Sequence, residues 1–445
     1  MTQMPPMKPI LTSILALSLL SSLTALSSTD LLPGTAYAAS ANNAVPAVSK
    51  DLLLPLKWQV ATDGMGMYDS KPPIMNGILY YSDSNKTLYA KNIPSGKVQW
   101  SYKQGEHPQI VTNNSVFFID NQEQLVKVSA ATGKLIWKVK VSERPIEIGA
   151  QARLINGKVY FANEYGVVAA YNPVSGKKLW ENKNIPMYAG TVYGDYSGVF
   201  VVSSTVDNIR TQFYGLDPAT GKRLWRIEGL YSYVTYQNGQ LLLREQAKTA
   251  AGNTATAVPG YQLTLVQLNP ATGKISGREN YNLLDDISRL GSAATSIQNS
   301  YVYTADGNLD QDGYTLTRFK RGADTDTAPT SYASFGNWLA GPADGMAFFQ
   351  HETQISGINL ANGNVVAFDH PADKVEHLQH VGKAVFAIYK NGYISINHSD
   401  TGALLGMINS GSKYPYFGNI TIDHGTALIP TEHHILAVAL PQEYQ

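Results

Sequence analysis

The stretch Tyr214–Trp225, YGLDPATGKRLW, decides the fold because its pattern recurs at an unchanged internal spacing. In each copy a short apolar run leads into a polar turn, and the glycine of that turn stands four residues before a tryptophan. Three further copies are VAAYNPVSGKKLW at 168–180, LVKVSAATGKLIW at 125–137 and LYAKNIPSGKVQW at 88–100. A motif that recurs in this way indicates an array of similar supersecondary units.

Each unit contains short runs of β-branched and aromatic residues bounded by turn residues, such as Ile78–Tyr81 after Asn-Gly and Val116–Phe118 after Asn-Ser. These runs are typical of strands and show no helical period. An Asn or Asp four residues before the glycine can accept backbone N–H groups, and the glycine can adopt a positive φ. These Asx residues are Asn92, Asn172, Asp217, Asn269 and Asn359. We therefore predict an all-β chain.

The number of units follows from weaker copies at Gly273, Gly363 and Gly402. The doubled gap before Gly363 contains a degenerate unit with strand-like runs at 301–303 and 314–319, so eight complete units result. Three C-terminal runs (420–422, 426–429 and 435–440) and one N-terminal run (57–60) are left over. Pairing them would close a ring and remove exposed edges. Because propellers of four-stranded blades have roughly four to eight blades, we expect a closed propeller of eight blades, with nine as the alternative.

Residues 1–38 have the features of an export signal: Lys8, a largely apolar stretch over 10–26, and small residues at 36–38. A membrane-spanning helix is less favoured, because Ser and Thr interrupt the apolar stretch. We predict a signal peptide at 1–38, an N-terminal extension at 39–55, one propeller domain at 56–440 and a C-terminal tail at 441–445. The protein is expected to be secreted.

The composition excludes several classes of function. Lys plus Arg and Asp plus Glu both number 34, and this balance argues against a nucleic-acid partner, which would need a basic face. The chain has no cysteine, which excludes disulfides, thiolate metal sites, cysteine nucleophiles and a lipid anchor on cysteine. We expect a monomer with no integral membrane segment after signal cleavage.

The repeated turn and tryptophan resemble the tryptophan-docking motif of pyrroloquinoline-quinone-like (PQQ-like) β-propeller repeats. That family includes quinoprotein alcohol dehydrogenases, the propeller lipoprotein of outer-membrane β-barrel assembly and many secreted bacterial proteins. The resemblance covers about residues 56–440 and weakens where Gly277, Ala367 and Gly406 replace tryptophan. It implies that each tryptophan packs near the turn of the neighbouring blade. The structural residues are then Trp58, Trp100, Trp137, Trp180 and Trp225, with Gly96, Gly133, Gly176, Gly221 and Gly273.

The residues needed for catalysis are not evident. The quinoprotein dehydrogenase pattern includes a vicinal cysteine pair, an Asp base and a Glu/Asn/Asp calcium site, and the sequence shows no matching cluster. It also has no G-x-S-x-G, H-E-x-x-H or glycine-rich phosphate motif. We predict no catalytic residue and no organic cofactor. The alternative is a quinone- or metal-dependent oxidoreductase, or a sugar-processing enzyme, with its site in the central channel.

One segment has the alternating oxygen ligands of a calcium loop. In DGNLDQDG at 306–313, oxygen-bearing side chains alternate with spacers and end at a glycine. The twelfth position from Asn308 is Phe319, where an EF-hand would have Glu, so the other reading is an acidic turn between strands. The calcium ligands would be Asp306, Asn308, Asp310 and Asp312. His377 with His380, or His433 with His434, are weaker candidates for a transition metal, and the plainer interpretation is polar loop residues.

The remaining candidate site is a recognition surface. Tyrosine is abundant, with 27 residues, and amphipathic rings suit partner contacts, although most tyrosines of an all-β chain must serve strand packing. Those near apparent loops are Tyr68, Tyr188, Tyr193, Tyr196, Tyr231, Tyr233, Tyr236, Tyr414 and Tyr416. Two bland insertions, 246–261 and 321–330, lengthen loops. We predict a non-catalytic propeller that binds a protein or cell-envelope partner. An envelope-assembly scaffold is a further alternative, against which the missing lipid-anchor cysteine counts.

Overall fold

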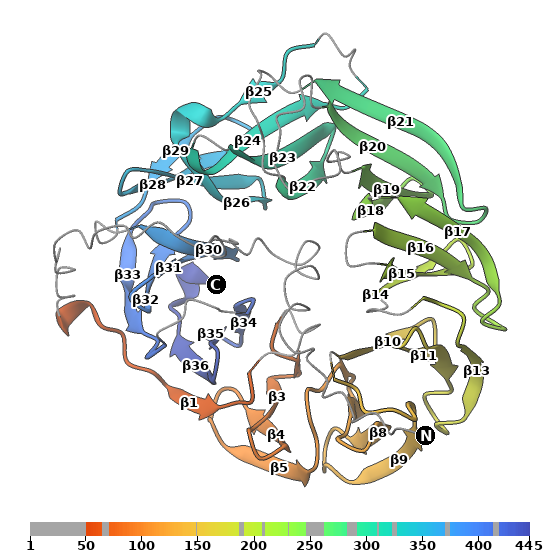
Figure 1. Cartoon of the computed structure of the whole chain (residues 1–445). Helices are drawn as coiled ribbons and strands as arrows, with labels where there is room; N and C mark the ends of the chain where they lie inside the picture. Colours follow the sequence, from red (N-terminus) through yellow and green to blue (C-terminus); the bar gives the residue numbers. More distant parts are fainter. Residues whose placement is uncertain are drawn as a thin grey trace, which may run out of the picture.

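The computed structural model describes residues 50–64, 71–147, 149–186, 191–206, 210–229, 231–245, 262–282, 292–308, 311–322, 327–369, 374–412 and 418–445. Within these ranges the chain forms nine four-stranded antiparallel sheets, arranged as the blades of a ring (Figure 1). The prediction of an all-β propeller is confirmed. The preferred count of eight blades is wrong, because the strands left over at the two chain ends form a complete ninth blade.

The first strand of each blade lies nearest the ring axis, and later strands lie progressively outward (Figure 1). Blade 1 contains β2 (Ile74–Met75), β3 (Ile78–Ser82), β4 (Thr87–Asn92) and β5 (Val98–Lys103). Blade 2 contains β6 (Ile110–Val111), β7 (Ser115–Ile119), β8 (Gln124–Ser129) and β9 (Leu135–Lys140). Blade 3 contains β10 (Ala150–Ile155), β11 (Lys158–Asn163), β12 (Val168–Tyr171) and β13 (Lys178–Asn182).

The middle blades have longer strands. Blade 4 contains β14 (Thr191–Tyr196), β15 (Val199–Val206), β16 (Arg210–Leu216) and β17 (Arg223–Gly229). Blade 5 contains β18 (Tyr231–Gln237), β19 (Gln240–Glu245), β20 (Gln262–Asn269) and β21 (Lys274–Asn282). Blade 6, the degenerate unit, contains β22 (Ser292–Gln298), β23 (Tyr301–Asn308), β24 (Gln311–Lys320) and β25 (Thr330–Ser331).

The last blades lead back to the start of the ring. Blade 7 contains β26 (Asn337–Ala343), β27 (Met346–His351), β28 (Gln354–Asn359) and β29 (Val365–Ala367). Blade 8 contains β30 (Val375–Val381), β31 (Ala384–Tyr389), β32 (Tyr393–His398) and β33 (Leu404–Asn409). Blade 9 contains β34 (Thr421–Asp423), β35 (Thr426–Pro430), β36 (His434–Ala439) and β1 (Trp58–Ala61). The described part of the chain also contains three short 3-10 helices, η1 (Lys50–Leu52), η2 (Ala333–Phe335) and η3 (Gln442–Tyr444).

The ring is closed by its own termini. The N-terminal strand β1 pairs antiparallel with β36, with Trp58 opposite Ala437 and Ala61 opposite His434 (Figure 1). This pairing completes the outer edge of blade 9 with a strand from the other end of the chain, as the leftover runs predicted. The closure therefore leaves no blade of the ring incomplete. Among the described residues, no helix is both long and apolar enough to cross a membrane.

Neighbouring blades share their hydrophobic cores. The cluster between blades 3 and 4, for example, joins Tyr160 and Trp180 to Phe200 and Tyr214, all of them buried. The rings of Tyr160 and Phe200 stack with centroids 3.8 Å apart. Because each sheet buries a face against the next, the fold depends on contacts between blades as much as on pairing within a blade.

The motif tryptophans lie between blades. The indole nitrogen of each donates a hydrogen bond to a carbonyl in the turn of the next blade: Trp58 to Ile93 (3.0 Å), Trp100 to Ala130 (2.8 Å), Trp137 to Pro173 (3.2 Å), Trp180 to Pro218 (3.0 Å) and Trp225 to Pro270 (2.7 Å). The ring then lies against the turn glycine, where a Cβ atom would overlap it: Trp58 on Gly96, Trp100 on Gly133, Trp137 on Gly176, Trp180 on Gly221 and Trp225 on Gly273. Each glycine is therefore needed as a surface for the preceding blade's tryptophan.

The junctions without tryptophan are filled in other ways. At Gly406, the space of a side chain is taken by Leu54 of the N-terminal segment, whose backbone N–H donates to Met407 at 2.8 Å. At Gly402, a Cβ atom would overlap the carbonyl oxygen of Ala367, so backbone replaces the indole there. The N-terminal extension and the C-terminal tail both belong to this packing, since Tyr444 is buried as well.

Between blades 5 and 6, Glu279 is the centre of a network of ion pairs and hydrogen bonds. The network lies next to Gly277, another position where glycine replaces tryptophan. Arg321 forms a two-point contact with Glu279, from Nε to Oε2 at 3.0 Å and from a terminal nitrogen to Oε1 at 2.7 Å. Tyr281 and Gln267 also donate to the Glu279 carboxylate, at 2.6 and 2.8 Å. Burial opposes ionisation of Glu279, but these hydrogen bonds outweigh it and lower its pKa.

The lowered pKa of Glu279 predicts a loss of stability in acid. An acid whose pKa is lower in the folded state than in the unfolded state contributes stability above its unfolded pKa, and the contribution is lost as the pH falls through its folded pKa. We expect the decline to begin near pH 4.5, the ordinary value for Glu. Thermal unfolding midpoints of the parent and Glu279→Gln proteins, measured between pH 7 and pH 3, should differ most at neutral pH and converge in acid. A constant difference across this range would contradict the prediction.

Candidate functional site

Four of the predicted tyrosines form one cluster on the inner strands of blades 4 and 5. Tyr193 and Tyr196 lie on β14, and Tyr233 and Tyr236 lie on β18 (Figure 1). The ring centroids of Tyr193 and Tyr233 are 4.8 Å apart, and those of Tyr196 and Tyr236 are 4.6 Å apart. The hydroxyl oxygens of Tyr196 and Tyr233 are 3.3 Å apart. We call these four residues the tyrosine cluster.

Three tyrosines of the cluster pack on the protein core, and the fourth is exposed to solvent. Tyr193, Tyr196 and Tyr233 pack partly buried on the core between blades 4 and 5, whereas Tyr236 is 36% exposed. Both strands carry a register shift, between Val192 and Gly194 in β14 and between Tyr233 and Thr235 in β18. The residue left out of the pairing is Tyr193 in β14 and Val234 in β18, so the tyrosines that touch across the two blades lie one position apart in the two hairpins.

The charges beside the tyrosine cluster come from blade 3 and from β14. Burial raises the pKa of Tyr193, and the nearby Arg153 guanidinium on β10 opposes this shift. Asp195 on β14 accepts a hydrogen bond from the amide of Asn156 at 3.1 Å. The exposed side chain of Leu154 lies next to Arg153 in the same strand. Of these groups, the Arg153 guanidinium acts on Tyr193 and Tyr196, whereas the side chain of Leu154 points to the opposite face of its strand.

The other tyrosines of the predicted surface are not part of the tyrosine cluster. Tyr231 is buried in the core between blades 4 and 5 and is unavailable to a partner. Tyr68, Tyr188, Tyr414 and Tyr416 lie outside the described residues, as do residues 246–261 of the first insertion. In the second insertion, Arg321 joins the Glu279 network and Thr330 begins β25.

The predicted calcium residues lie along the hairpin of β23 and β24. Asp306 is buried on β23 and accepts a hydrogen bond from Arg244 of blade 5 at 2.9 Å. The side chains of Asn308 and Asp312 lie outside the described part of the structure, as does the whole of Asp310. The calcium site therefore stays a prediction, and Asp306 would have to serve an ion pair and a metal together.

The histidine pairs lie in different surroundings. His377 and His380 are half-buried on β30, and burial lowers the pKa of both. The His380 ring packs edge-on against Phe348 of blade 7. His433 is exposed and lies 3.5 Å from the carboxylate of Glu432. In the described residues, no group of three or more His, Asp or Glu side chains is placed to hold a metal ion.

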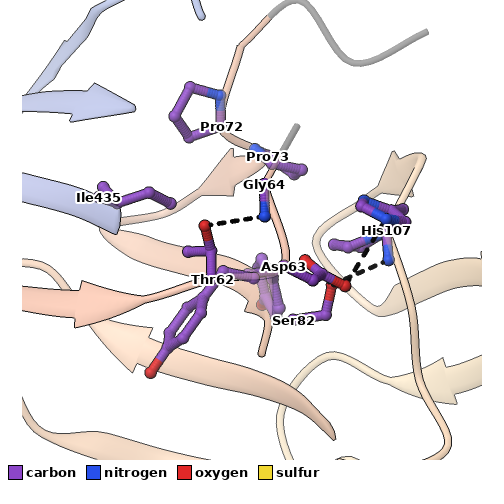
Figure 2. Close-up of a pocket in the computed structure, with 11 residues that line it drawn as sticks. Thr62, Asp63, Gly64, Pro72, Pro73, Ser82, His107 and Ile435 are labelled. Carbon is purple, nitrogen blue, oxygen red and sulfur yellow. Dashed lines mark hydrogen bonds and ion pairs between the residues drawn. The ribbon is translucent and has the colours of Figure 1, made fainter. Parts of the chain in front are cut away.

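A second feature, which the sequence does not predict, is a pocket where blade 9 meets blade 1 and the segment that leads to blade 2. It is a small hollow that is open to solvent, and we call it the seam pocket (Figure 2). Its polar wall contains Asp63, Ser82 and His107, and its apolar wall contains Pro72, Pro73, Pro108 and Ile435. These residues come from two blades and two connecting segments, and no motif spacing relates them.

The Asp63, Ser82 and His107 side chains do not have the geometry of a catalytic triad. The Ser82 hydroxyl donates to Asp63, at 2.9 Å to Oδ1 and 2.8 Å to Oδ2, rather than to the imidazole. The backbone N–H of His107 donates to the Ser82 oxygen at 3.1 Å. A nucleophilic serine needs a base that takes its proton, whereas here the hydroxyl holds a carboxylate and a loop in place.

Two glutamines near the axis, Gln109 (half-buried) and Gln379 (buried), join neighbouring blades and were also missed. Gln109 donates to the carbonyl of Ala150 on β10 at 2.8 Å and accepts from the N–H of Ala152. Gln379 on β30 makes the same kind of contact with the segment before β34, at 3.0 Å to the Gly418 carbonyl and 2.7 Å from the Ile420 N–H. A side-chain amide offers the same donor and acceptor as a peptide group, so it pairs with a strand of the next blade.

A family model described as outer membrane protein assembly factor BamB matches residues 55–194 and 122–366, which together make up most of the chain. A search of curated proteins gave no match.

The BamB structure from Moraxella catarrhalis is 11% identical, with a TM-score of 0.45, and the alignment covers 88% of this chain and 98% of that one. The computationally designed Ika8 protein is 8% identical, with a TM-score of 0.47 and coverage of 85% and 98%. Quinohemoprotein alcohol dehydrogenase from Comamonas testosteroni is 14% identical, with a TM-score of 0.43 and coverage of 88% and 78%. These TM-scores lie below 0.5, so the assignment depends on the family model and on the docked tryptophans. The chain belongs to the BamB family of PQQ-like β-propeller repeat proteins.

Proposed function

We propose that the protein is an exported, non-catalytic propeller that binds a protein of the cell envelope through the tyrosine cluster. The observation that carries this proposal is the contact between four tyrosine rings on adjacent inner strands, three of them partly buried and Tyr236 exposed. Family membership supports a role in assembling envelope proteins, because the matching model is described as an outer membrane protein assembly factor. The predicted signal peptide at 1–38 agrees with that location.

The tyrosine cluster suits binding because its side chains lose little conformational entropy when a partner binds. Tyrosine is enriched at interface hot spots, where it buries a large area and keeps a hydroxyl for hydrogen bonding. Ordering a side chain on binding costs about 0.5–1.5 kcal/mol. In the tyrosine cluster much of this cost is met on folding, since each ring is already held by a ring from the next blade. A partner would therefore gain aromatic contact area at a small entropic cost.

We expect Tyr236→Ala to weaken partner binding at least about tenfold, because truncation of an aromatic hot spot costs on the order of 2 kcal/mol. The measurement is photo-crosslinking in the native cell envelope, with benzoylphenylalanine at position 236. The captured protein is then identified, and its affinity for the purified parent and Tyr236→Ala proteins is measured.

Two controls separate recognition from folding. Benzoylphenylalanine at position 365, on the exposed outer strand β29 of blade 7, reports nonspecific capture. Tyr165→Ala removes a tyrosine of blade 3 that contacts Arg144 and lies outside the tyrosine cluster. Equal crosslinking from positions 236 and 365, or equal affinity of the Tyr236→Ala protein, would refute the proposal.

A further inference from the structure

Backbone hydrogen bonds hold the polar wall of the seam pocket in place. The backbone of Thr62 and Asp63 is held on both sides, since Thr62 N–H donates to His433 in blade 9 at 2.8 Å and Asp63 N–H donates to Ser82 in blade 1 at 3.1 Å. The Asp63 carboxylate is fixed in turn by the Ser82 hydroxyl. The pocket is thus preorganised by folding, which reduces the ordering cost of binding.

The negative charge of Asp63 is only partly compensated. Its side chain is 16% exposed, and the Nε2 atom of His107 stands 3.6 Å from Oδ2, longer than a hydrogen bond. Burial raises the pKa of Asp63, and the opposing effects of His107 and Ser82 do not cancel this shift. The carboxylate therefore loses hydration on folding without gaining a close cation among the partners described for it. An ionised carboxylate accepts several hydrogen bonds, so a further donor can be accommodated.

His107, which forms part of the pocket wall, has an unusual backbone conformation. His107 has φ of +35°, a conformation unusual for a residue other than glycine. Such conformations cost on the order of 1–3 kcal/mol and are concentrated at functional sites. Here this backbone conformation, together with the hydrogen bond from the His107 N–H to Ser82, places the imidazole beside Asp63 (Figure 2).

We propose that the seam pocket binds a primary ammonium group carried on a short aliphatic stem, with Asp63 as its counter-charge. The apolar wall of prolines and Ile435 fits the methylene stem, and Asp63 at the polar wall fits the cation. The same chemistry is offered by a free alkylamine and by the lysine side chain of a partner protein. The site is separate from the tyrosine cluster, so either proposal can fail without the other.

The test uses the full-length folded protein and three small probes in NMR or calorimetric titrations at pH 7.5. We expect saturable binding of n-butylamine and much weaker binding of 1-butanol, which has the same stem without the charge. Nα-acetyl-lysine-N-methylamide is expected to bind if the natural source is a partner's lysine, whereas a site for small amines takes n-butylamine alone. Either pattern supports the proposal, and the two patterns distinguish the sources.

Asp63→Asn keeps the acceptor for Ser82 and removes the charge, so amine affinity should fall at least about tenfold, the effect of losing one charge-assisted hydrogen bond. The matched control is Asp423→Asn, which removes a carboxylate also paired with a histidine, His424 at 2.8 Å, on blade 9 outside the seam pocket. That variant should bind the amine as the parent does. Equal binding of n-butylamine and 1-butanol by the parent, or undiminished amine binding by a folded Asp63→Asn protein, would overturn the proposal.

Discussion

Trp180→Ala is expected to destabilise the protein by about 3–5 kcal/mol, the usual cost of truncating a large buried aromatic residue. Trp180 is 7% exposed and belongs to the core shared by blades 3 and 4. The substitution leaves a cavity between two blades and removes the indole hydrogen bond to Pro218. Urea unfolding followed by far-UV circular dichroism measures the change in the free energy of unfolding.

Gly221, on which the Trp180 ring packs, allows a second measurement of how much this junction contributes to stability. At Gly221, φ is +71° and a Cβ atom would overlap the indole of Trp180. At Gly157, φ is +73° and a Cβ atom would have no neighbour within 4 Å. Alanine at either glycine costs roughly 1–2 kcal/mol of backbone strain, and overpacking at Gly221 adds about 1–3 kcal/mol.

The comparison of Gly221→Ala with Gly157→Ala therefore isolates the docking contact from the backbone effect. Trp180→Phe should be intermediate, because it keeps an aromatic ring and loses the indole donor. The Pro218 carbonyl stays satisfied in that variant by Lys158 at 2.7 Å. Equal losses of stability in the two glycine variants would show that contact with Trp180 contributes nothing.

The tryptophan and glycine positions could be predicted because docking depends on a fixed spacing within one unit. In five blades an Asx side chain sets the turn, as Asp217 does by accepting from Ala219 and Thr220 at 2.7 and 3.1 Å. The turn carries the glycine, and the following strand carries the tryptophan to the next blade. The number of blades is predicted less well, because the usual size range of propellers favours eight, whereas the strands left over at the two chain ends add up to a ninth.

The sites could be predicted less well because they depend on contacts between units. Tyr231 and Tyr233 are two residues apart on β18, yet the first is buried in the core and the second is half-buried. Both face the same core, and their depth in it depends on the packing of blade 4 against blade 5, which has no sequence signal of its own. Asp63, Ser82 and His107 are brought together by ring closure, which joins β1 to blade 9 before the chain enters blade 1. Only a structure places them side by side.

The junction between blades 5 and 6 contains a buried ion pair. The side chains of Arg244 and Asp306 are 4% and 0% exposed, and a terminal guanidinium nitrogen lies 2.9 Å from Oδ1. The other terminal nitrogen donates to Thr295 and Thr304, each at 2.6 Å. Burying two charges is costly, and the cost is offset only while both partners and their hydrogen bonds are present.

Asp306→Ala is therefore expected to destabilise the protein by about 3–5 kcal/mol, because it removes the Asp306 carboxylate from its ion pair with a buried guanidinium. The double variant Arg244→Met/Asp306→Leu should recover most of this loss, since apolar residues of similar volume remove the desolvation penalty as well as the pair. Urea unfolding with and without a calcium chelator measures both effects and tests the predicted calcium site. If Asp306 acts mainly through Arg244, the chelator leaves the parent unchanged and the double variant is rescued. If the chelator lowers the stability of the parent but not that of Asp306→Ala, and the double variant is not rescued, Asp306 acts as a metal ligand instead.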